Sequence, residues 1–179
     1  MAEKTEKNLR YIEYERAYKI CDQILQQYSS KRNLVDTLIS EGVLSKNCYF
    51  LEKDKYEEGV YLTYERFEDH TIVSHLLSED LDLEEAFKDG GTLFRYVSNS
   101  YRCQENRGVI DALSIQLPEK YSRELYEFTN HLEELGKVLI AKSFINSLLW
   151  RKTETLHDRL YEYINKTVLQ YESTFNELW

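Results

Sequence analysis

The sequence predicts a mainly α-helical protein with one small β-hairpin, in which a winged-helix-like unit precedes a stack of α-hairpins. Helix breakers are rare, because the 179 residues include one proline and six glycines. Apolar residues recur at three- and four-residue steps over most of the chain, which is the helical period. One short region is rich in aromatic and β-branched residues and predicts the hairpin.

The N-terminal part predicts two helices. The first covers about residues 14–28, and Ser29 and Ser30 end it. Its apolar stripe consists of Tyr14, Ala17, Tyr18, Cys21, Ile24, Leu25 and Tyr28. The second covers about residues 33–41, and Gly42 follows where a left-handed cap is favourable.

The hairpin is predicted from two strands, residues 48–51 and 60–64, which the charged segment 52–58 and Gly59 connect. Helical periodicity returns over residues 65–77. The order helix, helix, hairpin, helix is that of a winged-helix variant.

The second half predicts a helical domain. Residues 81–106 are less regular, with a break at 89–91, and 102–108 form a polar connection. Helices are expected at residues 109–117, 121–132, 137–150 and 153–179, separated by Pro118, 133–136 and 151–152. Antiparallel helices with short links indicate an α-hairpin stack. We therefore expect a winged-helix-like domain at 1–80 and a helical, repeat-like domain at 81–179. Trp179 ends the last stripe without a cap, which indicates that the natural chain continues.

Charge and composition exclude several function classes. The chain carries 23 Lys and Arg against 32 Asp and Glu, for a formal net charge of −9. This balance argues against binding to nucleic acid or to anionic membranes. No segment reaches the roughly 18 apolar residues of a membrane span, and the N-terminus lacks the apolar core of a signal peptide, so we expect a cytoplasmic protein. Cys21, Cys48 and Cys103 predict reduced, mostly buried thiols rather than a disulfide framework or a zinc site.

No motif for catalysis or cofactor binding occurs in the sequence. A P-loop, a dinucleotide-binding glycine pattern and a serine-hydrolase elbow are all missing, so we expect neither a catalytic residue, nor a metal, nor a cofactor in this chain. The most suggestive group is residues 65–70. Arg66 and His70 lie four residues apart and share a helix face, where the first turn could hold an anion. The alternative is a helix start laced with salt bridges, with His70 at the edge of the core. His131 and His157 are interpreted as surface or interface residues.

Several segments together resemble the region that follows the ATPase core in bacterial STAND-type, NACHT-like NTPases of antiviral defence. They are residues 38–44, residues 59–77 with the sequence GVYLTYERFEDHTIVSHLL, residues 108–119 and residues 147–151. The resemblance implies a winged helix that closes on ADP held by the ATPase core. It also implies a phosphate contact just after the last strand of the wing, which matches Tyr64 to Arg66, with His70 one turn later. The chain lacks the P-loop half, so it resembles an excised segment or a stand-alone relative without its ATPase.

We expect a non-catalytic regulatory and interaction segment of a STAND-type P-loop ATPase switch. Its partners would be a P-loop ATPase core, in cis or in trans, and a protein ligand of the helical arm, while ADP or ATP would bind in the parent protein. The ligand would shift the population from a closed to an open state. A second hypothesis is a winged-helix DNA-binding regulator with a helical dimerisation domain, whose recognition helix at 32–42 carries Asp36 and Glu41. A third is an acidic helical inhibitor that mimics nucleic acid.

Overall fold

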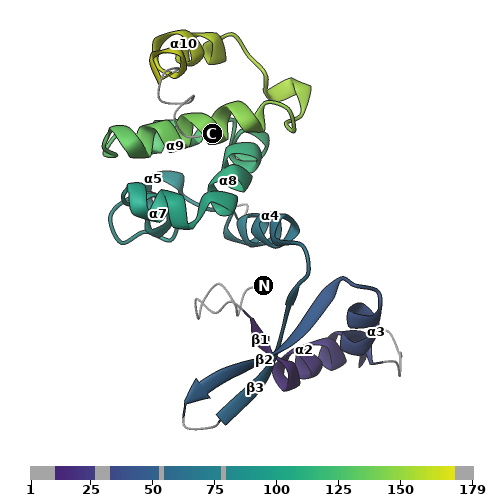
Figure 1. The fold of residues 1–179 in the computed structure, drawn as a ribbon. Helices are drawn as coiled ribbons and strands as arrows, with labels where there is room; N and C mark the ends of the chain where they lie inside the picture. The colour runs from purple at the N-terminus through teal and green to yellow at the C-terminus, as the bar shows by residue number, and fades with distance from the viewer. Residues whose placement is uncertain (1–10, 27–32, 53–54, 78–79, 172–179) are drawn as a thin grey trace. The chain divides into compact units, whose positions relative to one another are not determined.

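The computed structural model describes residues 11–26, 33–52, 55–77 and 80–171, and it is mainly helical with a small antiparallel sheet (Figure 1). This confirms the predicted fold class. The chain divides into two compact units, residues 1–68 and 69–179. The division falls inside helix α4 (Glu65–Leu76), whereas the sequence placed the domain boundary after residue 80. It falls earlier because Val73 and Leu77 pack in the core of the second unit.

The first unit contains a three-stranded antiparallel sheet with the strand order β1-β3-β2. Strands β2 (Leu44–Glu52) and β3 (Lys55–Leu62) form the predicted hairpin. β2 extends beyond the predicted residues 48–51 at both ends. β3 begins before the predicted residues 60–64 and ends two residues short of them. Strand β1 (Ile12–Glu13) pairs with Val60 and Gly59 of β3. The sequence prediction contained no strand here, because two residues cannot show an alternating pattern.

Helices α2 (Tyr14–Gln26) and α3 (Leu34–Ser40) lie between β1 and β2 in the chain. The side chain of Asn33 caps α3 by accepting a hydrogen bond from the backbone N–H of Asp36 (3.2 Å). Gly42 follows with a φ of 71°, the predicted left-handed conformation.

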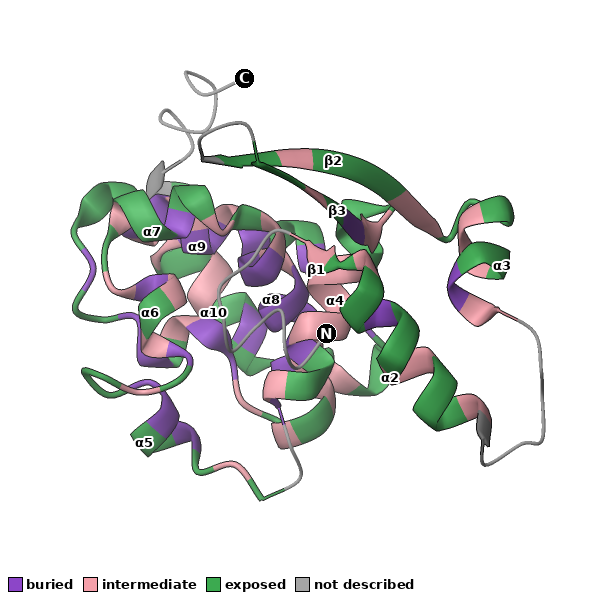
Figure 2. Cartoon of the chain, turned by 90° about the horizontal axis from the view of Figure 1, so that it is seen from below, coloured by how far each residue is buried: buried purple, intermediate pink, exposed green. Residues whose placement is uncertain are grey.

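The core of the first unit is small. Among its described residues, the buried apolar cluster consists of Ala17, Val35 and Val60, with five partly buried neighbours, Ile12, Tyr14, Cys21, Ile39 and Leu44. The predicted stripe of α2 is buried only in part, since Tyr18 and Ile24 are exposed, and Tyr28 lies outside the described residues. Figure 2 shows the exposed colour along much of α2 and β2.

Gly59 allows two tyrosine rings to stack on one face of the sheet. The rings of Tyr11 and Tyr49 lie parallel, with their centroids 3.7 Å apart. A Cβ atom at Gly59 would overlap the Tyr11 ring and would lie 2.8 Å from Cε2 of Tyr49. The stack therefore depends on the absence of a side chain at this position.

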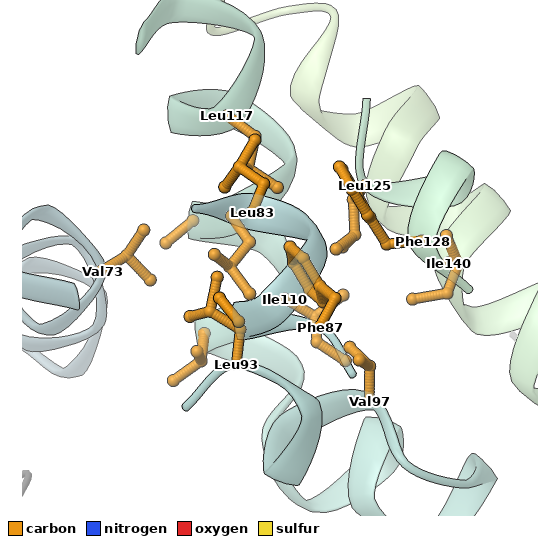
Figure 3. Packing of buried hydrophobic residues seen from close by; sticks show 14 of the residues in the cluster. Val73, Leu83, Phe87, Leu93, Val97, Ile110, Leu117, Leu125, Phe128 and Ile140 are labelled. Atoms are coloured by element: carbon orange, nitrogen blue, oxygen red, sulfur yellow. The ribbon is translucent and has the colours of Figure 1, made fainter. Parts of the chain in front are cut away.

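After the end of α4, the second unit continues with three short helices, α5 (Leu83–Ala86), α6 (Phe94–Val97) and α7 (Ser100–Glu105). Longer helices follow: α8 (Arg107–Tyr121), α9 (Glu134–Ser147) and α10 (Arg159–Lys166), with 3-10 turns η1 (Leu125–Phe128), η2 (Thr153–Thr155) and η3 (Val168–Tyr171). Their core is large and includes Val73, Leu83, Phe87, Leu93, Val97, Ile110, Leu117, Leu125, Phe128 and Ile140 (Figure 3).

Two predicted breaks in this unit are wrong. Pro118 lies inside the last turn of α8 instead of ending a helix before it. The proline removes one backbone hydrogen bond in this turn, and α8 ends at Tyr121, where the cap residue Ser122 has a φ of 54°. Residues 102–108, expected to form a polar connection, belong to the end of α7 and the start of α8.

Two predicted helices are also wrong. After Tyr121, which ends α8, this segment, residues 121–132, holds only the short turn η1, and Glu124 is its N-cap. The helix expected over 153–179 is interrupted into η2, α10 and η3 within its described part, and residues 172–179 lie outside the description. Leu160 and Val168 of its stripe are nevertheless buried. The helices predicted at 109–117 and 137–150 correspond to α8 and α9, which begin earlier.

Substitution of Gly59 by alanine should destabilise the first unit by about 1–3 kcal/mol, because the new methyl group overlaps the Tyr11 ring. Chemical denaturation followed by circular dichroism measures this change. The matched test is the same substitution in a Tyr11→Ala background, where the cost should become smaller. An equal cost in both backgrounds would contradict the assigned overlap.

Candidate functional site

The start of α4 carries the residues that the sequence singled out for a phosphate contact. Tyr64 precedes the helix, its carbonyl accepts the backbone N–H of Glu68 (3.1 Å), and its side chain is 68% exposed. Arg66 is exposed, and His70, one turn later, is half-buried. Arg66 and His70 share one face of α4, as the sequence predicts. The phosphate contact itself stays a prediction.

His70 takes part in the packing of α4 against α8. The Gln116 side-chain amide donates to the carbonyl oxygen of His70 (2.8 Å), and its nitrogen lies 3.3 Å from Nδ1 of the same histidine. One helical turn further on, the Lys120 ammonium donates to the carbonyl oxygen of Leu77 (2.7 Å). These bonds agree with the alternative that places His70 at the edge of a core.

The most strongly organised polar cluster surrounds a buried ion pair that sequence reasoning missed. The Arg151 guanidinium donates to both carboxylate oxygens of Glu124, at 2.6 Å and 2.9 Å, and the two side chains are 0% and 4% exposed. Its Nε donates to the hydroxyl of Ser147 (2.8 Å), which donates in turn to the carbonyl of Phe144 (2.6 Å). The guanidinium also lies 5.2 Å from the centroid of the Phe144 ring.

Glu124 is held on its other side by the turn that it begins. Its carboxylate accepts the backbone N–H of Glu127, and the Glu127 carboxylate accepts the backbone N–H of Glu124 (2.9 Å), which is a capping box. The buried carboxylate therefore has a full set of donors, and the pair acts as a structural element. The only sequence signal was a charged residue after the amphipathic stretch at 137–150, which is too common to be specific.

A hollow of ≈ 340 Å³ lies in the second unit. Its lining consists of Pro118, Glu119, Ser122, Lys152, Glu154, Thr155 and His157. The Glu119 carboxylate accepts the backbone N–H of Lys152 (3.1 Å), and the Lys152 ammonium lies 3.7 Å from its other oxygen. The charged groups that line the hollow are thus largely engaged with one another.

The remaining histidines and the cysteines are spread over both units. Nε2 of His131 lies 2.9 Å from the carbonyl oxygen of Val97, and His157 is exposed. Cys103 is buried and Cys21 is partly buried, but Cys48 is exposed, so the expectation of mostly buried thiols is wrong for that residue. Within the described residues, no group of three His, Cys, Asp or Glu side chains could hold a metal ion.

Exposed aromatic side chains are more numerous among the described residues of the first unit, with five, than in the second unit, where they are Tyr101, Trp150 and Tyr161. At the end of the hairpin, Phe50 and Tyr56 are 62% and 68% exposed, and their rings meet edge to face at 5.4 Å, with Leu51 beside them. Tyr64 and Phe67 are also exposed around the start of α4. The sequence analysis singled out Tyr64 but neither Phe50 nor Tyr56. The sequence signal that could have indicated their exposure is that Phe50 and Tyr56 lie beside and within the charged segment 52–58, away from the predicted helices.

The chain matches no protein-family model, no curated protein and no solved structure. No helix in the described parts of the chain has the length and apolar character that crossing a membrane requires.

Replacement of Arg151 by alanine should lower the free energy of unfolding by about 3–5 kcal/mol, because it leaves Glu124 buried without its counter-charge. Urea denaturation followed by circular dichroism measures the loss. The matched control is Arg123→Ala, which removes the same group from the more exposed pair with Glu127 and should cost about 0–1 kcal/mol. Equal losses in the two variants would contradict the structural role of the buried pair.

Alkaline pH should destabilise the second unit through Cys103. Burial, with a contribution from Glu133, raises the pKa of this thiol from 9.0 to about 11. The folded state thus favours the neutral thiol, so its stability contribution is complete below pH 9 and is lost as the pH rises towards 11. Unfolding free energies between these pH values should fall less steeply for Cys103→Ala than for the wild type. The exposed-site control Cys48→Ala should keep the wild-type slope.

Proposed function

We propose that this chain is a non-catalytic regulatory and interaction segment of a STAND-type P-loop ATPase switch. The observation that carries the proposal is the imbalance in the first unit between a very small core and a large exposed aromatic surface. The resemblance of residues 59–77 to the region after a STAND ATPase core supports the identity of the partner, a P-loop ATPase core in cis or in trans.

The small core makes a protein partner energetically useful to the first unit. Domains of about 60 residues bury only about 60% of the surface of their unfolded chain, so their stability is marginal. Among the described residues of the first unit, the buried apolar side chains are two valines and an alanine. A partner that covers Phe50, Leu51 and Tyr56 stabilises the folded unit by mass action. Exposed apolar patches of this kind mark interaction sites.

The regulatory part of the proposal concerns the two units and the helix that they share. The first residues of α4 belong to the first unit and the rest belongs to the second. A nucleotide-bound core that binds the first unit and a ligand that binds the helical second unit would each favour one state of the switch. The ligand shifts the population by the difference between its affinities for the two states.

The DNA-binding hypothesis is weakened by α3, its recognition helix. The described helix, Leu34–Ser40, carries Asp36 as its only charged residue, and that carboxylate accepts the Tyr14 hydroxyl (2.5 Å). Lys31 and Arg32 lie outside the described residues. A recognition helix relies on basic and amide side chains to contact phosphates and base edges.

The proposal predicts that the isolated chain neither hydrolyses ATP nor binds ADP tightly. Phosphate release and isothermal titration calorimetry with ADP measure these two properties, and both should give the signal of a buffer blank. Tight ADP binding or sustained phosphate release would overturn the non-catalytic part of the proposal.

The partner should be identified with the tagged chain in the cells that produce it. The wild type should recover a separate protein that contains a P-loop motif. Alternatively, the mass of the native protein should be well above that of this chain, which would place the chain within such a protein. The double variant Phe50→Ser, Tyr56→Ser should lose at least tenfold of the recovered ATPase. The control Tyr161→Ser, equally exposed but on α10 in the second unit, should retain it. Equal recovery by all three proteins would place the contact elsewhere.

A further inference from the structure

The outer edge of β2 is open. β2 pairs with β3 along one edge, and no strand among the described residues pairs with the other. The pairing with β3 is regular from Leu44 to Phe50, and an irregularity follows between Phe50 and Glu52. Seven consecutive residues, 44–50, therefore form a regular edge that pairs with no other strand in the described parts of the chain.

The backbone groups that face this edge follow from the hydrogen-bond pattern. The N–H of Thr63 donates to the carbonyl of Val43 (3.1 Å), so Val43 bonds towards β3. Because antiparallel residues alternate in direction, Leu44, Lys46, Cys48 and Phe50 direct their N–H and C=O groups outward. The Cys48 N–H agrees with this assignment, since its acceptor is the side-chain oxygen of its own neighbour Asn47 (2.9 Å).

Natural proteins block such edges with charged residues, proline or very short strands. Between Leu44 and Leu51 the single charged residue is Lys46, and there is no proline. The Lys46 ammonium is bound to Glu58 (2.8 Å) and lies 4.2 Å from the centre of the Tyr14 ring, so it contacts groups on its own sheet and on α2. The edge is thus suited to pairing with another strand.

We infer that the occupant is a second copy of this chain, and that two β2 strands pair antiparallel about a two-fold axis. Charge favours this edge as the place where two copies of the chain meet. The whole chain carries a net charge of −9, yet residues 44–51 contain no acidic residue, so copies meet there with the least repulsion. A two-fold contact is also closed, which limits the assembly to a dimer.

The register with complete overlap is centred on Asn47. It places Leu44 opposite Phe50 of the second copy and Lys46 opposite Cys48, with no like charges opposed. Leu44 thereby covers a ring that is 62% exposed in the single chain. Cys48 lies opposite Glu58 in its own sheet. Lys46 of the second copy, which lies opposite Cys48 on the other side, is therefore in the same cross-strand row as the Glu58 carboxylate. The contact is complementary in both apolar surface and charge.

The mass of the full chain in solution tests this inference. Light scattering after size exclusion, at about 100 μM to saturate a micromolar interface, should give twice 21.5 kDa. The variant Cys48→Pro removes an outward N–H but no bond to β3, so it should fold, as circular dichroism can verify, and should be monomeric. A monomeric wild type, or a dimer that Cys48→Pro leaves intact, would overturn the inference.

Disulfide trapping keeps the inference testable if the proline variant does not fold. In a Cys48→Ser background, Asn47→Cys should cross-link to its copy under mild oxidation, because opposed Cα atoms at this position lie about 4.5 Å apart. The control Lys55→Cys, on β3 and away from the open edge, should stay monomeric in denaturing gels without reductant. Equal cross-linking of both variants, or of neither, would contradict the proposed contact. The inference does not rest on the proposed ATPase partner, but both contacts involve Phe50, so the mass of the chain without that partner tests it.

Discussion

The second unit depends on one constraint, the burial of the opposite charges of Glu124 and Arg151 away from water. Removing two such charges from solvent costs several kcal/mol per ion, and the cost is offset only when every donor and acceptor has a partner in good geometry. The surrounding chain meets that requirement. Glu124 lies at the cap of η1, and Arg151 turns inward after α9 onto Ser147 and the Phe144 ring. The pair thereby joins the segment that follows α8 to the segment that follows α9.

The ion pair and the apolar core stabilise the second unit in different ways. The core contributes by removing a large apolar area from water, and it is insensitive to direction. The pair contributes specificity, because a bidentate contact tolerates only one arrangement of η1 and the end of α9. The first unit has no comparable buried ion pair among its described residues, and only three of its described apolar side chains are buried. It therefore has less stabilisation from apolar burial and less specificity from buried charges than the second unit.

The sequence predicted most of the fold, because helical periodicity reports which residues face a core. It identified α2, α3, α4, α8, α9 and the β2–β3 hairpin. It failed where a tertiary contact overrides local preference. The stripe over 121–132 is helical in pattern, but the structure forms only the short turn η1 there, and its N-cap Glu124 is bound to the distant Arg151. Pro118 was taken as a break because its position relative to the end of α8 cannot be read locally. The ion pair and the open edge of β2 depend on long-range placement, which a single sequence does not carry.

The burial of Cys103 separates the two units in their response to oxidants. The thiolate is the reactive form of cysteine, and the core around Cys103 suppresses both its ionisation and its access to solvent. Cys48, in the first unit, is exposed. Oxidising agents therefore modify the sheet long before they reach the helical core. The rate at which Cys103 becomes modified is then set by the opening of the second unit, so that rate reports how often this unit unfolds.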